Sequence, residues 1–178
     1  MHSGPVCEWL RHPVANAPSA HAPLNWVLGG IVNNNRVSAE DRADIFDLIS
    51  EYAFSFDEDR ISDYVELFLD DAELSFFTAT SDEPFQSAFN NDERLVLMQE
   101  TRSGSINEAG QPRHVQTNTV LTHISPDRVS GRTLLICTQQ PYDGSDSRTL
   151  FTGVYEDEFQ RTPTGWKFAV RRGHLDIP

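Results

Sequence analysis

The sequence predicts an α+β fold in which helices come first and a strongly bent antiparallel sheet follows. Residues 38–101 contain three segments whose apolar residues recur at helical spacing. From His114 onwards the period of the pattern changes to two, and short turns join four long alternating segments. Short turns between long strands favour an antiparallel meander, so we expect the helices to pack on one face of this sheet.

The first predicted helix begins after Ser38 and runs to about Phe56. Ser38 precedes the residues Ala-Glu-Asp, a pattern typical of a helix start because the serine oxygen can accept a hydrogen bond from an unpaired backbone N–H. The apolar residues of this helix share one face, with Tyr52 on one shoulder and Asp57 on the other. Both polar groups are therefore expected to point towards the interior.

Two further helices and a first strand complete the first part of the chain. The apolar positions of the second helix are Ile61, Tyr64, Val65 and Phe68. This short helix is predicted to end at the acidic residues 70–71, and residues 73–80 are predicted to form a strand. A third helix is predicted over residues 92–101, with Asn90 or Asn91 as its cap.

The second part of the chain carries the alternating pattern. The predicted strands are His114 to Ile124, Val129 to Gln140, Arg148 to Arg161 and Trp166 to His174. Residues 103–112 are rich in turn-forming residues and predict a mobile loop before the first of these strands. In the last strand we expect Trp166, Phe168 and Val170 to pack between the sheet and the helices.

Composition argues against several classes of function. The 178-residue chain has a formal net charge of -13 and a pI of about 4.7, so most of its surface would repel nucleic acid and anionic membranes. No stretch approaches the ~20 apolar residues that a membrane-spanning helix needs. Cys7 and Cys137 lie in no CxxC pattern, which favours a reducing compartment over a disulfide framework or a zinc site. Residues 23–32 lack the basic segment and cleavage site of a signal peptide, so we expect a cytoplasmic protein.

Domain organisation follows from the same features. Residues 1–36 are rich in Pro, Ala, Asn and His and show no sustained period, which predicts an N-terminal extension. Residues 37–178 are expected to form one domain, because this length is sufficient to bury a core without disulfide bonds.

Tyr52, Asp57 and His114 are the candidate catalytic residues. An inward-facing carboxylate needs a partner, because burial without one raises its pKa above the ordinary value of about 3.9. His114 opens the first alternating segment and is the candidate partner. An imidazole, with an ordinary pKa of about 6.5, is a usable general base, and a carboxylate on its second nitrogen fixes the tautomer. We expect the three side chains to meet between the first helix and the sheet. There His114 would remove a proton next to a carbonyl or conjugated system while Tyr52 binds the substrate oxygen.

Four further residues are candidates for substrate contacts. Strict alternation places Asn118 and Val120 on the strand face of His114, which would present polar groups and then hydrocarbon to a half-polar cavity. Asn118 would help to hold a developing enolate. Phe56 lies on the apolar face of the first helix, and His174 near the end of the last strand is expected at the rim of the pocket. No metal site is indicated, because the histidines of the sheet region lack ligand spacing such as HExxH.

Three stretches of the sequence resemble the SnoaL-like branch of the NTF2-like superfamily. They are the helical segment EDRADIFDLISEYAFSFDEDRISDYVELFLDDAEL, the strand start RHVQTN and the closing hairpin YEDEFQRTPTGWKFAVRR. The resemblance covers roughly residues 38–172 and implies an NTF2-like cone, with three N-terminal helices packed on a curved antiparallel sheet. It also implies an activity without a cofactor and a homodimer or higher homo-oligomer.

The arrangement of Tyr52, Asp57 and His114 is similar to that of scytalone dehydratase-like and bile-acid dehydratase-like enzymes. In such enzymes, the resemblance implies, an Asp–His dyad removes a proton and a tyrosine assists departure of the hydroxyl. Dehydrochlorinase-like members carry a lysine near the tyrosine position, so Tyr52 favours loss of water. The resulting hypothesis is a lyase, isomerase or cyclase that acts on a small hydrophobic hydroxy or keto compound.

Two alternatives without catalysis remain at this stage. The small subunit of a ring-hydroxylating dioxygenase shares the fold and would need an iron-bearing partner. A module that binds a hydrophobic ligand is the other alternative. A cavity that encloses the Asp57–His114 pair would favour the enzyme. The sequence does not identify the substrate, the net reaction or its stereochemistry.

Overall fold

The computed structural model describes residues 36–102 and 110–178. Nearly all of the predicted N-terminal extension and most of the predicted loop at 103–112 lie outside this part of the chain. The helices are α1 (Ala39–Asp57), α2 (Ile61–Glu66) and α3 (Asn91–Thr101). The strands are β1 (Phe68–Phe77), β2 (Gln86–Ala88), β3 (Gly110–Ser125), β4 (Arg128–Pro141), β5 (Arg148–Thr162) and β6 (Gly165–Leu175).

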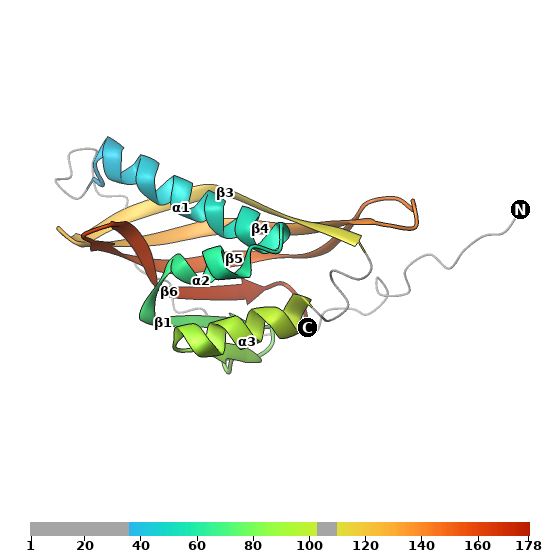
Figure 1. Ribbon diagram of the computed structural model, residues 1–178. Helices are drawn as coiled ribbons and strands as arrows, with labels where there is room; N and C mark the ends of the chain where they lie inside the picture. The colour runs from blue at the N-terminus through green and yellow to red at the C-terminus, as the bar shows by residue number, and fades with distance from the viewer. Residues whose placement is uncertain (1–35, 103–109) are drawn as a thin grey trace, which may run out of the picture. The chain divides into compact units, whose positions relative to one another are not determined.

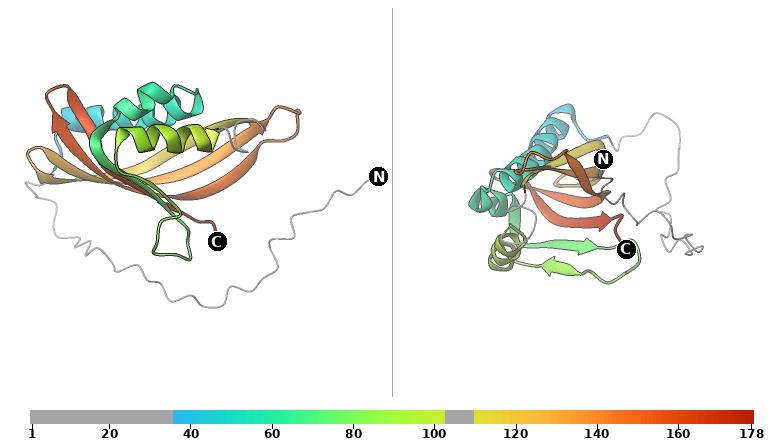
Figure 2. Two further views of the ribbon diagram at one scale, coloured as in Figure 1. Left: turned by 60° about the horizontal axis from the view of Figure 1, so that its bottom comes forward. Right: turned by 90° about the vertical axis from the view of Figure 1, so that its right-hand side faces the viewer.

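The described strands form one sheet in the order β2-β1-β6-β5-β4-β3. Strands β3 to β6 make the predicted antiparallel meander, and the three helices lie on one face of the sheet (Figure 1). The sheet curves around the side on which the helices lie (Figure 2). The predicted α+β fold is confirmed, with one difference. The sheet is mixed, because β1 pairs with β6 in parallel.

Side-chain caps fix the starts of the two longer helices. Ser38 accepts a hydrogen bond from the backbone N–H of Asp41 at 3.0 Å, as predicted. Asn90 accepts one from the backbone N–H of Glu93 at 2.9 Å, and the Glu93 carboxylate accepts the N–H of Phe89 at 2.7 Å. These bonds resemble a capping box, except that Glu93 binds the N–H of the residue before the N-cap, and they fix the start of α3.

The prediction that the second helix extends to residues 70–71 is wrong. Helix α2 ends at Glu66, and Phe68 already belongs to β1. Phe68 pairs with Phe168 of β6, and the carbonyl of Leu67 accepts the N–H of Phe168 at 2.9 Å. Sheet pairing therefore replaces the helical spacing at this point. The short strand β2 was not expected from the sequence, because three residues are too few to show an alternating pattern.

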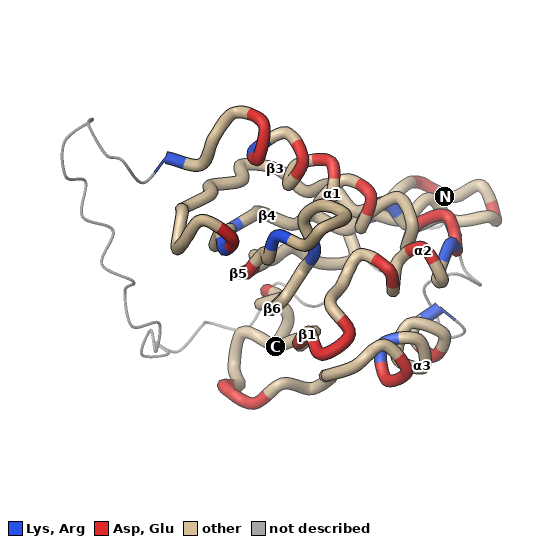
Figure 3. Tube along the Cα trace, turned by 60° about the vertical axis from the view of Figure 1, so that its left-hand side comes forward, with Lys and Arg blue, Asp and Glu red and all other residues tan. Residues whose placement is uncertain are grey.

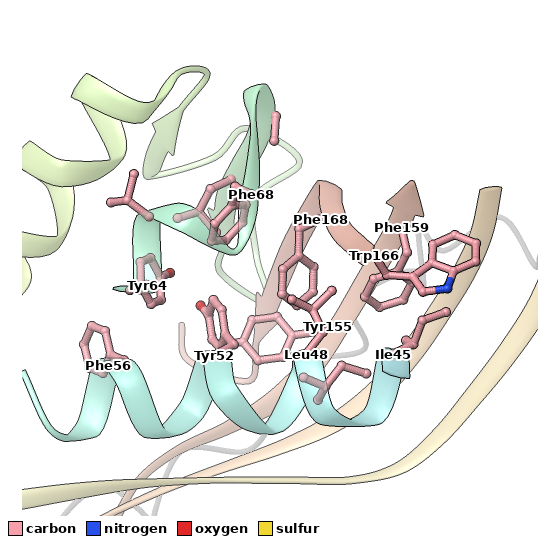
Figure 4. Close-up of a cluster of buried hydrophobic side chains, with 14 of the residues drawn as sticks. Ile45, Leu48, Tyr52, Phe56, Tyr64, Phe68, Tyr155, Phe159, Trp166 and Phe168 are labelled. Carbon is pink, nitrogen blue, oxygen red and sulfur yellow. The ribbon is translucent and has the colours of Figure 1, made fainter. Parts of the chain in front are cut away.

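The core between the helices and the sheet is rich in aromatic side chains (Figure 4). Tyr52 on α1 makes ring contacts with Phe68 on β1 and with Phe168 on β6, at centroid distances of 6.2 and 5.7 Å. Phe159 of β5 lies 5.1 Å from Phe168. Because the rings are tilted or edge-to-face, these contacts add to the free energy gained from burial alone.

Two β-bulges change which side chains face the helices. In β3, two residues between Thr117 and Val120 lie opposite one residue of β4, and Asn118 adopts a positive φ of 54°. In β6, Ala169 has no partner in β5 because Phe159 pairs with Phe168 while Glu158 pairs with Val170. Beyond each bulge the inward and outward positions are exchanged relative to strict alternation.

Candidate active site

Asp57 and His114 form a buried pair between α1 and β3. Asp57 is the last residue of α1, and its Oδ1 lies 2.7 Å from Nδ1 of His114. Its Oδ2 accepts the backbone N–H of His114 at 2.9 Å. The side chains of Asp57 and His114 are 3% and 8% exposed. Gln111 adds a further link, since its Nε2 donates to the backbone carbonyl of Asp57 at 2.8 Å.

This geometry determines the tautomer of His114. An ionised carboxylate can only accept hydrogen bonds, so Nδ1 of the neutral imidazole carries the proton that Asp57 binds. The lone pair is then on Nε2, at the far side of the ring. An imidazole held in this way can take a proton from a ligand, and the carboxylate stabilises the imidazolium that forms.

The His114 ring lines a cavity of about 210 Å³. The apolar lining residues are Phe56, Phe76, Phe85, Met98, Phe151, Leu175 and Ile177. The polar lining residues are Tyr52, Gln86, Thr101, His114 and Tyr155. Asp and Glu are frequent on α1 and α3 (Figure 3), yet no Asp, Glu, Lys or Arg is among the described residues that line the cavity. The cavity therefore suits a small, largely apolar, uncharged molecule.

A second buried charge pair lies beside the cavity. Arg171 of β6 donates to Asp157 of β5 from Nε at 2.9 Å and from Nη2 at 3.2 Å, and both side chains are 0% exposed. Nη2 also donates to Oε1 of Gln116 at 2.7 Å, and Nε2 of Gln116 donates to the carbonyl of Ile49 in α1 at 2.9 Å. Burial raises the pKa of Asp157 to about 6, although Arg171 acts in the opposite direction.

Two tyrosines flank this arginine, and a third packs against one of them. The guanidinium carbon of Arg171 lies 3.9 Å from the ring centroid of Tyr52 and 3.9 Å from that of Tyr155. The hydroxyls of Tyr52 and Tyr155 are 3.4 Å apart. The ring of Tyr64 lies 4.8 Å from that of Tyr52. Burial raises the pKa of Tyr64 and of Tyr155 well above the ordinary value, so both are protonated phenols at neutral pH.

Cys137 lies directly across the ladder from His114 and is buried. Burial and the nearby Asp57 raise the pKa of the Cys137 thiol to about 12.

In a Cys7→Ser variant, we expect Cys137 to react with an aromatic disulfide reagent roughly 10³-fold more slowly than the thiol of the urea-unfolded chain, because the thiolate is the reacting form. Absorbance of the released thiolate measures the rate. Equal rates in the folded and unfolded chains would contradict this placement.

The structure brings four of the predicted residues together. Tyr52, Phe56 and His114 line one cavity, and Asp57 holds His114 from behind. The ring of Phe56 packs edge-on against that of His114 at 5.0 Å. Each of these residues precedes the first bulge in its strand or lies on a regular helix, where simple periodicity holds.

The predicted placement of Asn118, Val120 and His174 is wrong. Asn118 lies in the β3 bulge and is exposed, and the bulge turns Val120 outward, where it is 50% exposed. His174 follows the β6 bulge and stacks on Phe77 at 4.9 Å, while its neighbour Leu175 lines the cavity. The β6 bulge also turns Val170 away from the core that it was expected to join.

Sequence reasoning did not identify Tyr155, Asp157 or Arg171. Tyr155 and Asp157 occupy alternate positions of β5, whose burial pattern is regular at this point. This regular alternation could have revealed a buried charge pair, since an inward Asp on an otherwise apolar strand face needs a cation as its partner. Arg171 carried no such signal, because strict alternation from Trp166 and Phe168 directs it outward.

Two kinds of feature are absent from the described residues. No group of three or more His, Cys, Asp or Glu in residues 36–102 and 110–178 could hold a metal ion. Within the same residues, no helix is long and apolar enough to cross a membrane.

Solved structures with the same fold include proteins of several described activities. The chain is 23% identical to the hexachlorocyclohexane dehydrochlorinase LinA-type3 of Novosphingobium barchaimii LL02, with a TM-score of 0.61 over 78% of this chain and 88% of that one. It is 17% identical to a candidate scytalone dehydratase of Novosphingobium aromaticivorans DSM 12444, with a TM-score of 0.64 over 78% and 85%. A candidate aromatic-ring-hydroxylating dioxygenase β subunit of that organism is 20% identical, with a TM-score of 0.65 over 76% and 89%.

These likenesses show the fold and leave the reaction open, because enzymes and a subunit without a stated activity of its own are among them. A search of curated proteins gave no significant match. The model of the SnoaL-like domain matches residues 37–172, which is most of the chain. The cone of helices and curved sheet, the three resembling stretches and this match agree, and the chain belongs to the family of SnoaL-like domains.

Proposed function

We propose that the protein is a cofactor-independent lyase of the dehydratase type, or an isomerase or cyclase, that acts on a small hydrophobic hydroxy or keto compound. The observation that carries this proposal is the pair of hydrogen bonds from His114 to Asp57 at the wall of an apolar cavity. A histidine with a purely structural role has no need to place its ring at the wall of a cavity, with a carboxylate bound on the side of the ring away from that cavity.

In the proposed reaction, Nε2 of His114 removes a proton from the carbon next to a carbonyl or conjugated system. The C–H bond breaks, an N–H bond forms, and the electron pair moves to the substrate oxygen as an enolate. Tyr52 donates a hydrogen bond to that oxygen or protonates a departing hydroxyl. Elimination of water, migration of a double bond and ring closure all begin with this proton transfer.

The nature of the cavity supports an uncharged substrate of modest size. Buried aromatic and aliphatic walls favour a ring or a short hydrocarbon segment. The resemblance implies that dehydrochlorinase-like members carry a lysine near the position of Tyr52, so Tyr52 favours water over chloride as the leaving group. A non-catalytic small subunit would gain nothing from an enclosed Asp–His dyad, so this alternative is less well supported.

Replacement of His114 by Ala or by Gln is expected to lower turnover by roughly 10²–10⁴-fold, since either change removes the proposed base. Turnover of a panel of β-hydroxy ketones and phenolic alcohols, followed by the ultraviolet absorbance of the conjugated product, measures the effect. His123→Gln on the same strand is the matched control and is expected to keep wild-type turnover. Undiminished turnover in both His114 variants would remove the proposed base.

A further inference from the structure

Gln86 differs from the other polar residues that line the cavity. The hydroxyls of the two lining tyrosines approach each other, the His114 ring binds the carboxylate at the end of α1, and Thr101 donates to the carbonyl of Leu97 at 2.8 Å. Within residues 36–102 and 110–178, no hydrogen bond engages the side chain of Gln86. Its amide therefore brings two N–H donors and one acceptor oxygen to the cavity wall.

The backbone of β2 directs the Gln86 side chain towards the cavity. Gln86 and Ala88 are alternate residues of this strand, so their side chains share one face, and Ala88 is fully buried in the core. Phe76 of β1 pairs with Gln86 and also lines the cavity. Because paired residues of antiparallel strands present their side chains on the same face, the amide lies on the side of the sheet that faces the helices.

Gln86 and His114 reach the cavity from opposite edges of the sheet. Their strands, β2 and β3, are the first and last in the strand order. Helix α1 packs against β3, and α3 packs against β1 and β2 (Figure 1). The sheet curves around the helix side, which allows both edges to border one cavity (Figure 2). The imidazole and the amide are therefore placed to contact different ends of one bound molecule.

The end of the cavity at Gln86 is the open end. Phe85 is 49% exposed although it lines the cavity, and its ring lies 6.4 Å from that of Phe76. The side chains of Asp57 and His114, in contrast, are only 3% and 8% exposed. A molecule whose reacting carbon lies at His114 consequently presents its other end to Gln86, beside the opening.

The cavity lining determines which chemical group suits this second end. No Asp, Glu, Lys or Arg is among the described lining residues, which favours an uncharged group. A hydroxyl matches a primary amide, because it can accept a hydrogen bond from Nε2 of Gln86 and donate one to Oε1. An engineered cavity of about 150 Å³ in another protein holds one benzene molecule, so about 210 Å³ accommodates one ring with short substituents.

We propose that Gln86 is a specificity-determining residue, which binds a hydroxyl group at the end of the substrate remote from the reacting carbon. The ligand class is a single-ring ketone that carries this hydroxyl across the ring from its carbonyl group. The proposal rests on the proposed function in one respect, because it places the reacting carbon at His114. Gln86 then selects both the substrate and the direction in which the substrate enters the cavity.

The test compares 4-hydroxyacetophenone with 4-methylacetophenone, which has nearly the same shape and lacks the hydroxyl. Isothermal titration calorimetry measures both dissociation constants for the wild type and for Gln86→Leu. The ratio of the two affinities, hydroxyl over methyl, is expected to fall about tenfold in Gln86→Leu, because leucine is similar in size and has no hydrogen-bonding atom in its side chain. Gln99→Leu, at an exposed glutamine of α3, is the matched control and is expected to keep the wild-type ratio. An unchanged ratio in Gln86→Leu would overturn the proposal.

The wild type alone provides a second test if Gln86→Leu does not fold. A buried hydroxyl without a hydrogen-bond partner costs free energy, so a purely apolar cavity would bind the methyl compound more tightly. The wild type is expected to bind the hydroxyl compound at least as tightly as the methyl compound. Tighter binding of the methyl compound, or no binding of either, contradicts the proposal.

The role of Gln86 can also fail independently of the proposed base. Binding of these ketones involves no proton transfer, so the same ratio can be measured in a His114→Gln protein. Addition of Gln86→Leu to this variant is still expected to lower the ratio about tenfold. If it does so while His114→Gln keeps wild-type turnover, the role of Gln86 stands and the base is wrong. If the ratio is unchanged while His114→Gln loses turnover, the base stands and the role of Gln86 is wrong.

Discussion

Asp57→Asn is expected to lower turnover by about 10⁴-fold while the fold is retained. The carboxylate of Asp57 accepts two N–H groups of His114, one from the ring and one from the backbone. A carboxamide has one acceptor oxygen and one donating amino group. If its oxygen keeps the backbone N–H, its amino group faces Nδ1, which must then be unprotonated. The ring proton moves to Nε2, and the lone pair that should take the substrate proton is lost from the cavity side.

The measurement is kcat/KM for the panel compound that the wild type converts fastest, with circular dichroism as the check on folding. Asp59→Asn is the matched control, because Asp59 lies just beyond the end of α1 and its side chain is 68% exposed. It is expected to remain within about twofold of the wild type. A folded Asp57→Asn protein with wild-type kcat/KM would mean that the contact with His114 serves structure alone.

The dyad could be predicted from the sequence because regular elements carry both of its members. On α1, the 3.6-residue period directs Tyr52 and Asp57 inward, and the helix is unbroken between them. His114 lies at the fifth position of β3, well before the irregular part of that strand. The sequence could not supply the distance between Asp57 and His114. The position of β3 in the sheet decides which of its residues lies beside the end of α1.

The errors in which face of a strand a side chain occupies share one physical cause. A bulge inserts a single residue, and every side chain beyond it changes face. Asn118 can adopt a positive φ at little cost, but nothing in its neighbours indicates that it does so. Ala169 in β6 carries even less signal, and its bulge exchanges the faces of Val170 and Arg171. Strict alternation alone therefore could not predict which residues beyond the β3 bulge face the cavity, or that Arg171 is buried.

The buried cation also explains why the site side of the sheet can hold so many polar groups. Arg171 binds Asp157 and Gln116 and stacks on two tyrosine rings, so Nε and Nη2 of the guanidinium are paired with acceptors on two neighbouring parts of the sheet. Through Gln116 the same network reaches the carbonyl of Ile49 on α1. The helix that carries Tyr52 and Asp57 is thus tied to the sheet by hydrogen bonds as well as by apolar packing.

Arg171→Met is expected to lower the free energy of unfolding by about 3–5 kcal/mol, because it leaves the carboxylate of Asp157 buried without its cation. Urea denaturation followed by tryptophan fluorescence measures the change. Arg172→Met is the matched control at the next residue. Arg172 binds Glu73 with a 45% exposed side chain, so its loss is expected to cost less than about 1 kcal/mol. Equal losses in the two variants would show that the Arg171 pair contributes no more than a surface contact.

The pH dependence of this loss separates the charge of Asp157 from the volume of Arg171. In the wild type the pKa of Asp157 is raised by burial to about 6, above its value in the unfolded chain, so its contribution to stability falls as the pH rises towards 6. Without Arg171 the pKa in the folded state rises further, and the fall continues to higher pH. The difference between wild type and Arg171→Met is therefore expected to be larger at pH 8 than at pH 5.5. Arg171→Met with Asp157→Leu removes both charges and should recover much of the loss at pH 8. A loss that is equal at both pH values and unchanged in the double variant would assign the effect to packing.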